Sequence, residues 1–66
     1  MEVFVNGSAR VLPDGSTVAE LVEILGLARL RLAVEINREI VPRSAYPEHR
    51  LKSGDRVEIV RAIGGG

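Results

Sequence analysis

The 66-residue sequence predicts an α+β fold, a mixed sheet of four or five strands with one main helix packed on one face. Apolar and polar residues alternate near both ends of the chain, one stretch between them has helical spacing, and turn residues separate these segments. A chain of this length forms one domain at most and buries only about 60% of its unfolded surface. Little room is left for an enclosed substrate pocket, which weighs against an autonomous enzyme.

The chain begins with a predicted β-hairpin. Residues 2–6 and 8–12 are rich in valine and alternate weakly between apolar and polar side chains. Asn6 and Gly7 between them form a strong hairpin signal, because both tolerate the positive φ angles of a two-residue turn. The segment Pro13-Asp14-Gly15 has turn chemistry and ends the second strand.

A short amphipathic helix is predicted over residues 17–25. Thr17 is a good N-cap, and Glu20 three residues later completes a capping box. Gly26 suits the position that closes a helix. The apolar residues of this segment share one helical face, which we expect to lie on the sheet: Val18, Leu21, Val22 and Leu25.

The second half of the chain predicts further strands. Alternation over residues 32–36 indicates a half-buried strand, and Asn37-Arg38 turns the chain. Residues 39–41 return as a short strand that Pro42 ends, because proline cannot donate a ladder hydrogen bond. Residues 43–52 look irregular.

The last strand is predicted over residues 56–62, after a turn at Ser53-Gly54-Asp55. The element order is therefore ββαββ with an extra short strand near residue 40. We expect the β-grasp (ubiquitin-like) arrangement, in which the first and last long strands lie side by side at the centre of the sheet.

Composition excludes several classes of function. Nine basic residues balance nine acidic ones, so the chain lacks the basic excess that nucleic-acid binding needs. It has no cysteine, which excludes disulfides, thiolate zinc sites and a thiol that carries sulfur. Apolar runs stay well short of the roughly 20 residues of a membrane span, and the N-terminus lacks the basic region of a signal peptide. We therefore expect a cytoplasmic protein that binds no membrane.

The end of the chain, Gly64-Gly65-Gly66, is the most informative feature. We expect a β-grasp domain over residues 1–63 and a flexible glycine tail over residues 64–66, which reaches roughly 10 Å when extended. An arm without side chains can enter a narrow channel. Its α-carboxylate is ionised at neutral pH and unreactive, so it needs activation, typically as an acyl adenylate formed with ATP. Sulfide or a persulfide can then displace AMP and leave a thiocarboxylate. A frayed terminus without function is the alternative.

Several segments together resemble the ThiS family of thiamine-pathway sulfur carriers, over essentially the whole chain. Two small departures are visible, Tyr46 where the family often has tryptophan, and Gly64 before the usual glycine pair. The segments that carry the resemblance are Val5-Asn6-Gly7, Thr17-Val18-Ala19-Glu20-Leu21, Ala33-Val34-Glu35-Ile36-Asn37, Ile40-Val41-Pro42-Arg43, Gly54-Asp55-Arg56-Val57-Glu58-Ile59-Val60 and Gly65-Gly66.

The resemblance implies a function and a set of partners. A ThiF-like, E1-type enzyme would adenylate Gly66, and a cysteine desulfurase-type donor would convert it to a thiocarboxylate. A ThiG-like thiazole synthase would then take the sulfur into the thiazole of thiamine. ATP and magnesium would belong to the adenylating partner, because this chain has no phosphate-binding loop and is expected to bind no cofactor or metal itself.

Alternation along the first and last strands predicts a partner-binding face. Val3 and Val5 should face the helix and Phe4 the opposite side. In the last strand Glu58, Val60 and Ala62 should also face outward. If the two strands are neighbours, Phe4 and Val60 form an exposed apolar patch. Such a patch at the base of the tail indicates a docking surface. Ordinary scattered apolar residues are the alternative.

Two further side chains, Ile63 and His49, each have alternative roles. Ile63 either anchors the base of the tail in a partner channel or caps the core. His49 is the only histidine, and we expect a surface-loop residue, because a metal site needs several matched ligands.

Other functional classes use the same chemistry. A carrier for the molybdenum cofactor, tRNA thiolation or cysteine synthesis would also load sulfur on a terminal glycine. A ubiquitin-like modifier would join the activated terminus to a lysine of a target protein, and a β-grasp interaction module would use no activation at all.

Overall fold

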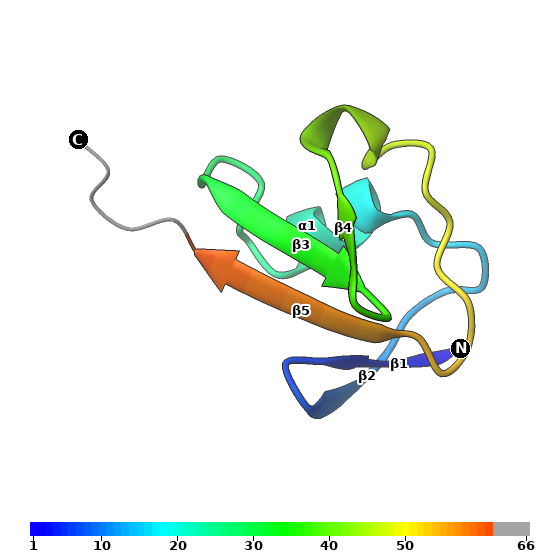
Figure 1. Ribbon diagram of the computed structural model, residues 1–66. Helices are drawn as coiled ribbons and strands as arrows, with labels where there is room; N and C mark the ends of the chain where they lie inside the picture. The colour runs from blue at the N-terminus through cyan, green and yellow to red at the C-terminus, as the bar shows by residue number, and fades with distance from the viewer. Residues whose placement is uncertain (62–66) are drawn as a thin grey trace.

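The computed structural model describes residues 1–61 and forms one five-stranded sheet with a helix on one face (Figure 1). The strand order is β2-β1-β5-β3-β4. This mixed sheet confirms the predicted fold class. The elements are β1 (Glu2–Val5), β2 (Ser8–Val11), α1 (Val18–Ile24), β3 (Leu32–Ile36), β4 (Glu39–Val41), a 3₁₀ turn η1 (Arg43–Ala45) and β5 (Arg56–Arg61).

The first and last strands are neighbours at the centre of the sheet, as predicted. β1 and β5 run parallel, with Phe4 opposite Arg56 and Val5 opposite Val57. β2 lies antiparallel to β1, and β3 lies antiparallel both to β5 and to β4. The two hairpins at the sheet edges are therefore joined by β5 alone.

Both hairpin turns lie where they are predicted, and both have left-handed backbone. Asn6 and Gly7 have φ angles of 49° and 84°, and Asn37 and Arg38 have 51° and 71°. Two consecutive positive φ angles define a type I′ turn, whose twist matches that of the flanking strands. Asparagine adopts this conformation more readily than most residues other than glycine.

The helix begins with the predicted capping box. Thr17 Oγ1 accepts a hydrogen bond from the Glu20 main-chain N–H at 3.2 Å, and Glu20 Oε1 accepts one from the Thr17 N–H at 2.9 Å. Two donors that the first helical turn would leave free are thus satisfied. The helix ends at Ile24, one residue before the predicted bound, and Gly26 follows with φ 74°.

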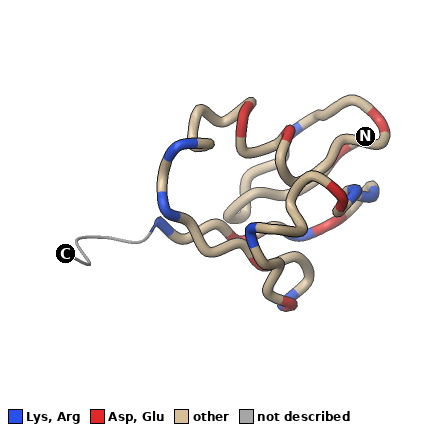
Figure 2. The backbone as a smooth tube through the Cα atoms, turned by 90° about the horizontal axis from the view of Figure 1, so that it is seen from above, with Lys and Arg blue, Asp and Glu red and all other residues tan. Residues whose placement is uncertain are grey.

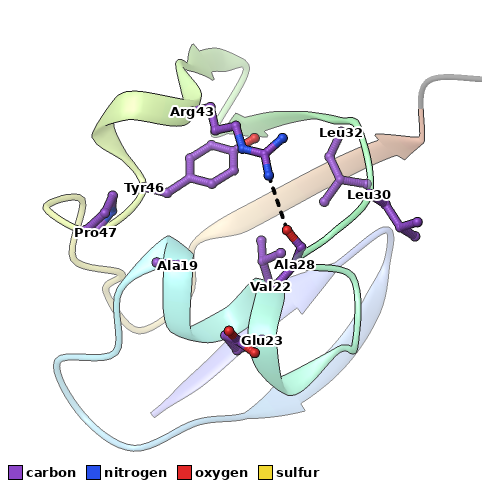
Figure 3. A pocket seen from close by; sticks show the side chains of 9 residues that line it. All are labelled: Ala19, Val22, Glu23, Ala28, Leu30, Leu32, Arg43, Tyr46 and Pro47. Atoms are coloured by element: carbon purple, nitrogen blue, oxygen red, sulfur yellow. Dashed lines mark hydrogen bonds between the residues drawn. The ribbon is translucent and has the colours of Figure 1, made fainter.

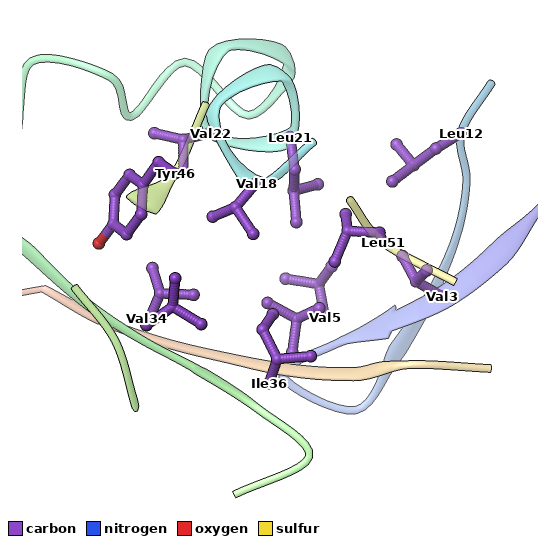
Figure 4. Close-up of a cluster of buried hydrophobic side chains, with 12 residues drawn as sticks. Val3, Val5, Leu12, Val18, Leu21, Val22, Val34, Ile36, Tyr46 and Leu51 are labelled. Atoms are coloured by element: carbon purple, nitrogen blue, oxygen red, sulfur yellow. The ribbon is translucent and has the colours of Figure 1, made fainter. Parts of the chain in front are cut away.

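The core lies between α1 and the inner face of the sheet (Figure 4). Val3, Val5 and Val57 are buried there, as alternation predicts, and Ile59 is half-buried. The loop after β4 contributes Tyr46, which packs against the core as expected. The buried hydrophobic residues are Val3, Val5, Leu12, Val18, Leu21, Val22, Val34, Ile36, Val41, Tyr46, Leu51 and Val57.

Candidate functional site

The described chain ends at Arg61, the last residue of β5 and the cross-strand partner of Leu32. Figure 1 shows this end of β5 at the margin of the molecule, away from the N-terminus. The remaining residues predicted to act, Ala62, Ile63, Gly64, Gly65 and Gly66, lie outside the described residues and stay predictions, as does the boundary between domain and tail.

The outward face of the sheet holds the other three predicted residues. Val60 is 60% exposed and Glu58 is exposed, whereas Phe4 is half-buried. All three lie on the face opposite the core, because their neighbours Val57 and Val3 are buried. The predicted orientation of these side chains is therefore confirmed.

The predicted joint patch of Phe4 and Val60 is wrong. Phe4 lies opposite Arg56, and Val60 follows four residues later along β5, roughly 13 Å away at the rise of a strand. Glu58 lies between them on the same face. The cause is the register, because β1 ends at Val5, before it reaches the level of Val60.

The outward face instead carries two small apolar pairs on either side of charged residues. Phe4 is paired with Ala9 on β2, and Val60 is paired with Ala33 on β3. Strand alternation could have placed Ala33 outward, but its contact with Val60 follows only from the pairing of β3 with β5.

A pair of glutamates lies between the two apolar pairs. Glu35 and Glu58 are directly opposite each other on β3 and β5, an arrangement of like charges that costs stability. Ile40, opposite Glu35 on β4, is 75% exposed. This row therefore combines two like charges with an exposed apolar side chain on one face.

A groove of about 330 Å³ lies on the inner side of the sheet beside the end of β5. Its polar side chains include Arg10 and Arg61, and its apolar ones include Leu25 and Leu27. Figure 2 shows basic segments near the point where the described chain ends, while both charges occur elsewhere. The end of the described part of β5 is therefore bordered by guanidinium groups.

A smaller hollow of about 210 Å³ lies between α1 and the loop that follows β4 (Figure 3). Arg43 closes one side by donating from Nη2 to the Ala28 carbonyl at 3.2 Å. The volume is below that of typical pockets for small molecules. His49 is half-buried in the neighbouring loop.

The described residues hold no group of three or more His, Cys, Asp or Glu side chains placed to bind a metal ion. Nor does any helix within residues 1–61 have the length and apolar character needed to cross a bilayer.

Comparison with curated proteins gives matches over the whole chain. The chain is 35% identical to the sulfur carrier protein ThiS of Escherichia coli K12 over 66 residues, which is the full length of both. It is also 42% identical over 66 residues to a thiazole synthase of Paramagnetospirillum magneticum, of which it spans only 20% of the length.

Comparison with solved structures also gives a match to ThiS. A crystal structure of the thiamine biosynthesis protein ThiS from Geobacter metallireducens superposes with a TM-score of 0.85 at 33% identity, with both chains covered completely. The model of the ThiS family matches residues 2–66. On these grounds the chain belongs to the ThiS family.

Proposed function

We propose that this protein is a sulfur carrier of thiamine biosynthesis and that it carries sulfur as a thiocarboxylate on Gly66. The observation that carries the proposal is the full-length match to ThiS, in a chain whose central strand β5 leads directly to the glycine end. As in the sequence-based interpretation, the chain contributes its own terminus as the reacting group and acts as a co-substrate of partner enzymes.

The chemistry has two steps. The Gly66 carboxylate attacks the α-phosphate of ATP, which yields an acyl adenylate and releases pyrophosphate. Hydrosulfide then adds to the acyl carbon and AMP leaves with its bonding electron pair, so that the carboxylate oxygen is replaced by sulfur without net oxidation. The chain has no cysteine, so the sulfur comes from another molecule.

Three partners complete this scheme. A ThiF-like enzyme binds ATP and magnesium and adenylates Gly66. A cysteine desulfurase-type donor supplies sulfur as a persulfide, from which a second thiol releases hydrosulfide by reduction and itself becomes part of a disulfide. A ThiG-like thiazole synthase receives the sulfur from the carrier. Support for the last partner comes from thiazole synthases of Paramagnetospirillum magneticum and Magnetococcus marinus, each of which contains a stretch similar to this whole chain. Because activation consumes ATP, we place the carrier in the cytoplasm.

Mass spectrometry tests the proposed loading. The purified protein, incubated with a ThiF-like enzyme, ATP, magnesium and sulfide, should gain about 16 Da at the terminal carboxyl group, as oxygen is replaced by sulfur. The same mixture without ATP is the control. A branched peptide on a lysine of another protein would instead indicate a ubiquitin-like modifier. If ATP causes no change in mass, a β-grasp interaction module would be the remaining function. A native chain that continues unprocessed beyond Gly66 would contradict the proposal.

Docking of the adenylating enzyme is assigned to the outward face near the end of β5. Replacing Val60 by Asp should weaken binding about tenfold, because a carboxylate would be buried against an apolar contact beside Glu58. Val11→Asp is the matched control, since Val11 is 80% exposed on β2 and lies away from that end. Isothermal calorimetry with the enzyme gives both dissociation constants. Equal dissociation constants for the two variants would show that Val60 does not lie in the interface.

A further inference from the structure

The Asn6 side chain holds β5 by two hydrogen bonds to a single residue. Asn6 Oδ1 accepts from the Ile59 main-chain N–H at 2.8 Å, and Asn6 Nδ2 donates to the Ile59 carbonyl at 3.1 Å. These groups are 53 positions apart in sequence, so the contact links the first hairpin to the last strand.

The two bonds continue a ladder that the backbone itself has stopped making. Phe4 N–H donates to the Asp55 carbonyl at 2.9 Å, and Asn6 N–H to the Val57 carbonyl at 2.8 Å. In a regular parallel ladder the next bond would run from Ile59 N–H to the main-chain carbonyl of Asn6. Asn6 has entered the hairpin turn at φ 49°, however, and its side-chain amide takes the place of that carbonyl.

The Asn6 contact lies near the end of β5. Ile59 is two residues before Arg61, where the described chain ends. β3 holds the other side of β5 as far as the pair of Leu32 and Arg61. On the β1 side, the Asn6 contact is the last hydrogen bond that the described residues make to β5. Without it, the β1 side of the strand would have no hydrogen bond from the described residues beyond Val57.

We propose that Asn6 is a positioning residue, which fixes the end of β5 and thereby the strand from which the chain continues toward Gly66. This inference rests on the proposed adenylation of Gly66. It assigns to Asn6 a role in presentation of the chain end, separate from the role of Asn6 and Gly7 in the turn. A root that is already ordered loses less conformational entropy when the arm enters a partner's active site, and affinity benefits.

Asn37 provides a matched control within the same chain. It occupies the same position of the other type I′ turn, with φ 51°. Its Oδ1 accepts from the Arg56 N–H at 3.0 Å, and its Nδ2 donates to Asp55 Oδ1 at 3.0 Å. Asn37 therefore holds the beginning of β5 by the same chemistry, at the end opposite the arm.

Amide hydrogen exchange by NMR tests the contact itself. Glycine keeps the positive φ angle at either turn and removes the side-chain amide, and its added backbone entropy is common to both variants. In Asn6→Gly, exchange of the Ile59 N–H should accelerate about tenfold relative to that of Arg56, and Asn37→Gly should show the reverse. A uniform acceleration in both variants would mean that the two asparagines contribute only general stability, and the proposal would be wrong.

Adenylation kinetics with a ThiF-like enzyme and ATP test the consequence. Asn6→Gly should raise KM for the carrier about fivefold, the factor that corresponds to one net hydrogen bond, with kcat nearly unchanged. Asn37→Gly should leave both constants near the parent values. Asn6→Asp keeps the acceptor for Ile59 N–H and loses the donor, so its KM should lie between those of the parent and Asn6→Gly.

The outcomes separate two kinds of failure. If the parent protein is not adenylated, the proposed function fails, while the exchange data still report on the contact. If the parent is adenylated and Asn6→Gly matches it in KM, or if Asn37→Gly is impaired equally, the positioning role is refuted.

Discussion

A protein shortened by the single residue Gly66 should take up sulfur at less than a hundredth of the parent rate. Deletion moves the terminal carboxylate back by roughly 3.3 Å, whereas a misplacement of about 1 Å can already cost a hundredfold in rate. Its free energy of unfolding should stay within about 0.5 kcal/mol of the parent value. The reason is that the buried hydrophobic residues of the described chain lie between Val3 and Val57. The loading assay with ATP and sulfide, together with urea denaturation, measures both.

A full-length protein with an amidated terminus is the control for arm length. It keeps every residue of the arm and removes only the carboxylate. Sulfur uptake should be lost here as well, because the amide cannot attack ATP as a carboxylate does. Undiminished uptake by the amidated protein would show that the sulfur is carried somewhere other than Gly66.

Replacing Leu21 by Ala should cost about 3 kcal/mol of folding free energy and leave much of the protein unfolded. Leu21 is fully buried at the centre of α1, where the helix faces the sheet. Truncation of a buried leucine removes its transfer free energy and opens a cavity, at a cost of about 2–5 kcal/mol. A domain of this size has few kcal/mol to lose. Urea unfolding followed by far-UV circular dichroism measures the change.

Ile24→Ala is the matched substitution on the same helix. Ile24 is 56% exposed, so its truncation should cost less than about 1 kcal/mol. Comparable losses in the two variants would contradict the assignment of the core to the Leu21 face.

The parts of the fold that could be predicted are those with local signals. The capping box of Thr17 and Glu20 and the turn at Asn6 and Gly7 depend on residues within three positions of each other. Alternation likewise gave the inward and outward faces of β5 correctly, because the period of a strand requires no knowledge of its neighbours.

The errors and omissions share a different cause. The apolar patch of Phe4 and Val60 required the register between β1 and β5, which lie at opposite ends of the chain. The contact of Asn6 with Ile59 depends on the same register. The sequence therefore indicated the turn at Asn6, but it did not indicate that the Asn6 side chain also bonds to the main chain of Ile59. The register between strands that are distant in sequence depends on which side chains the whole core buries, and a short segment does not contain that information.

The position of β5 between the two hairpins also affects how the chain folds. Until the last strand arrives, β1 with β2 and β3 with β4 share no ladder, so a nascent chain holds two fragments rather than half a fold. Pairing between segments this far apart in sequence slows folding relative to a fold built from local contacts. The strand that joins the two hairpins is also the one that precedes the glycine end of the sequence. An incompletely folded chain would therefore lack the paired strand that precedes its glycine end.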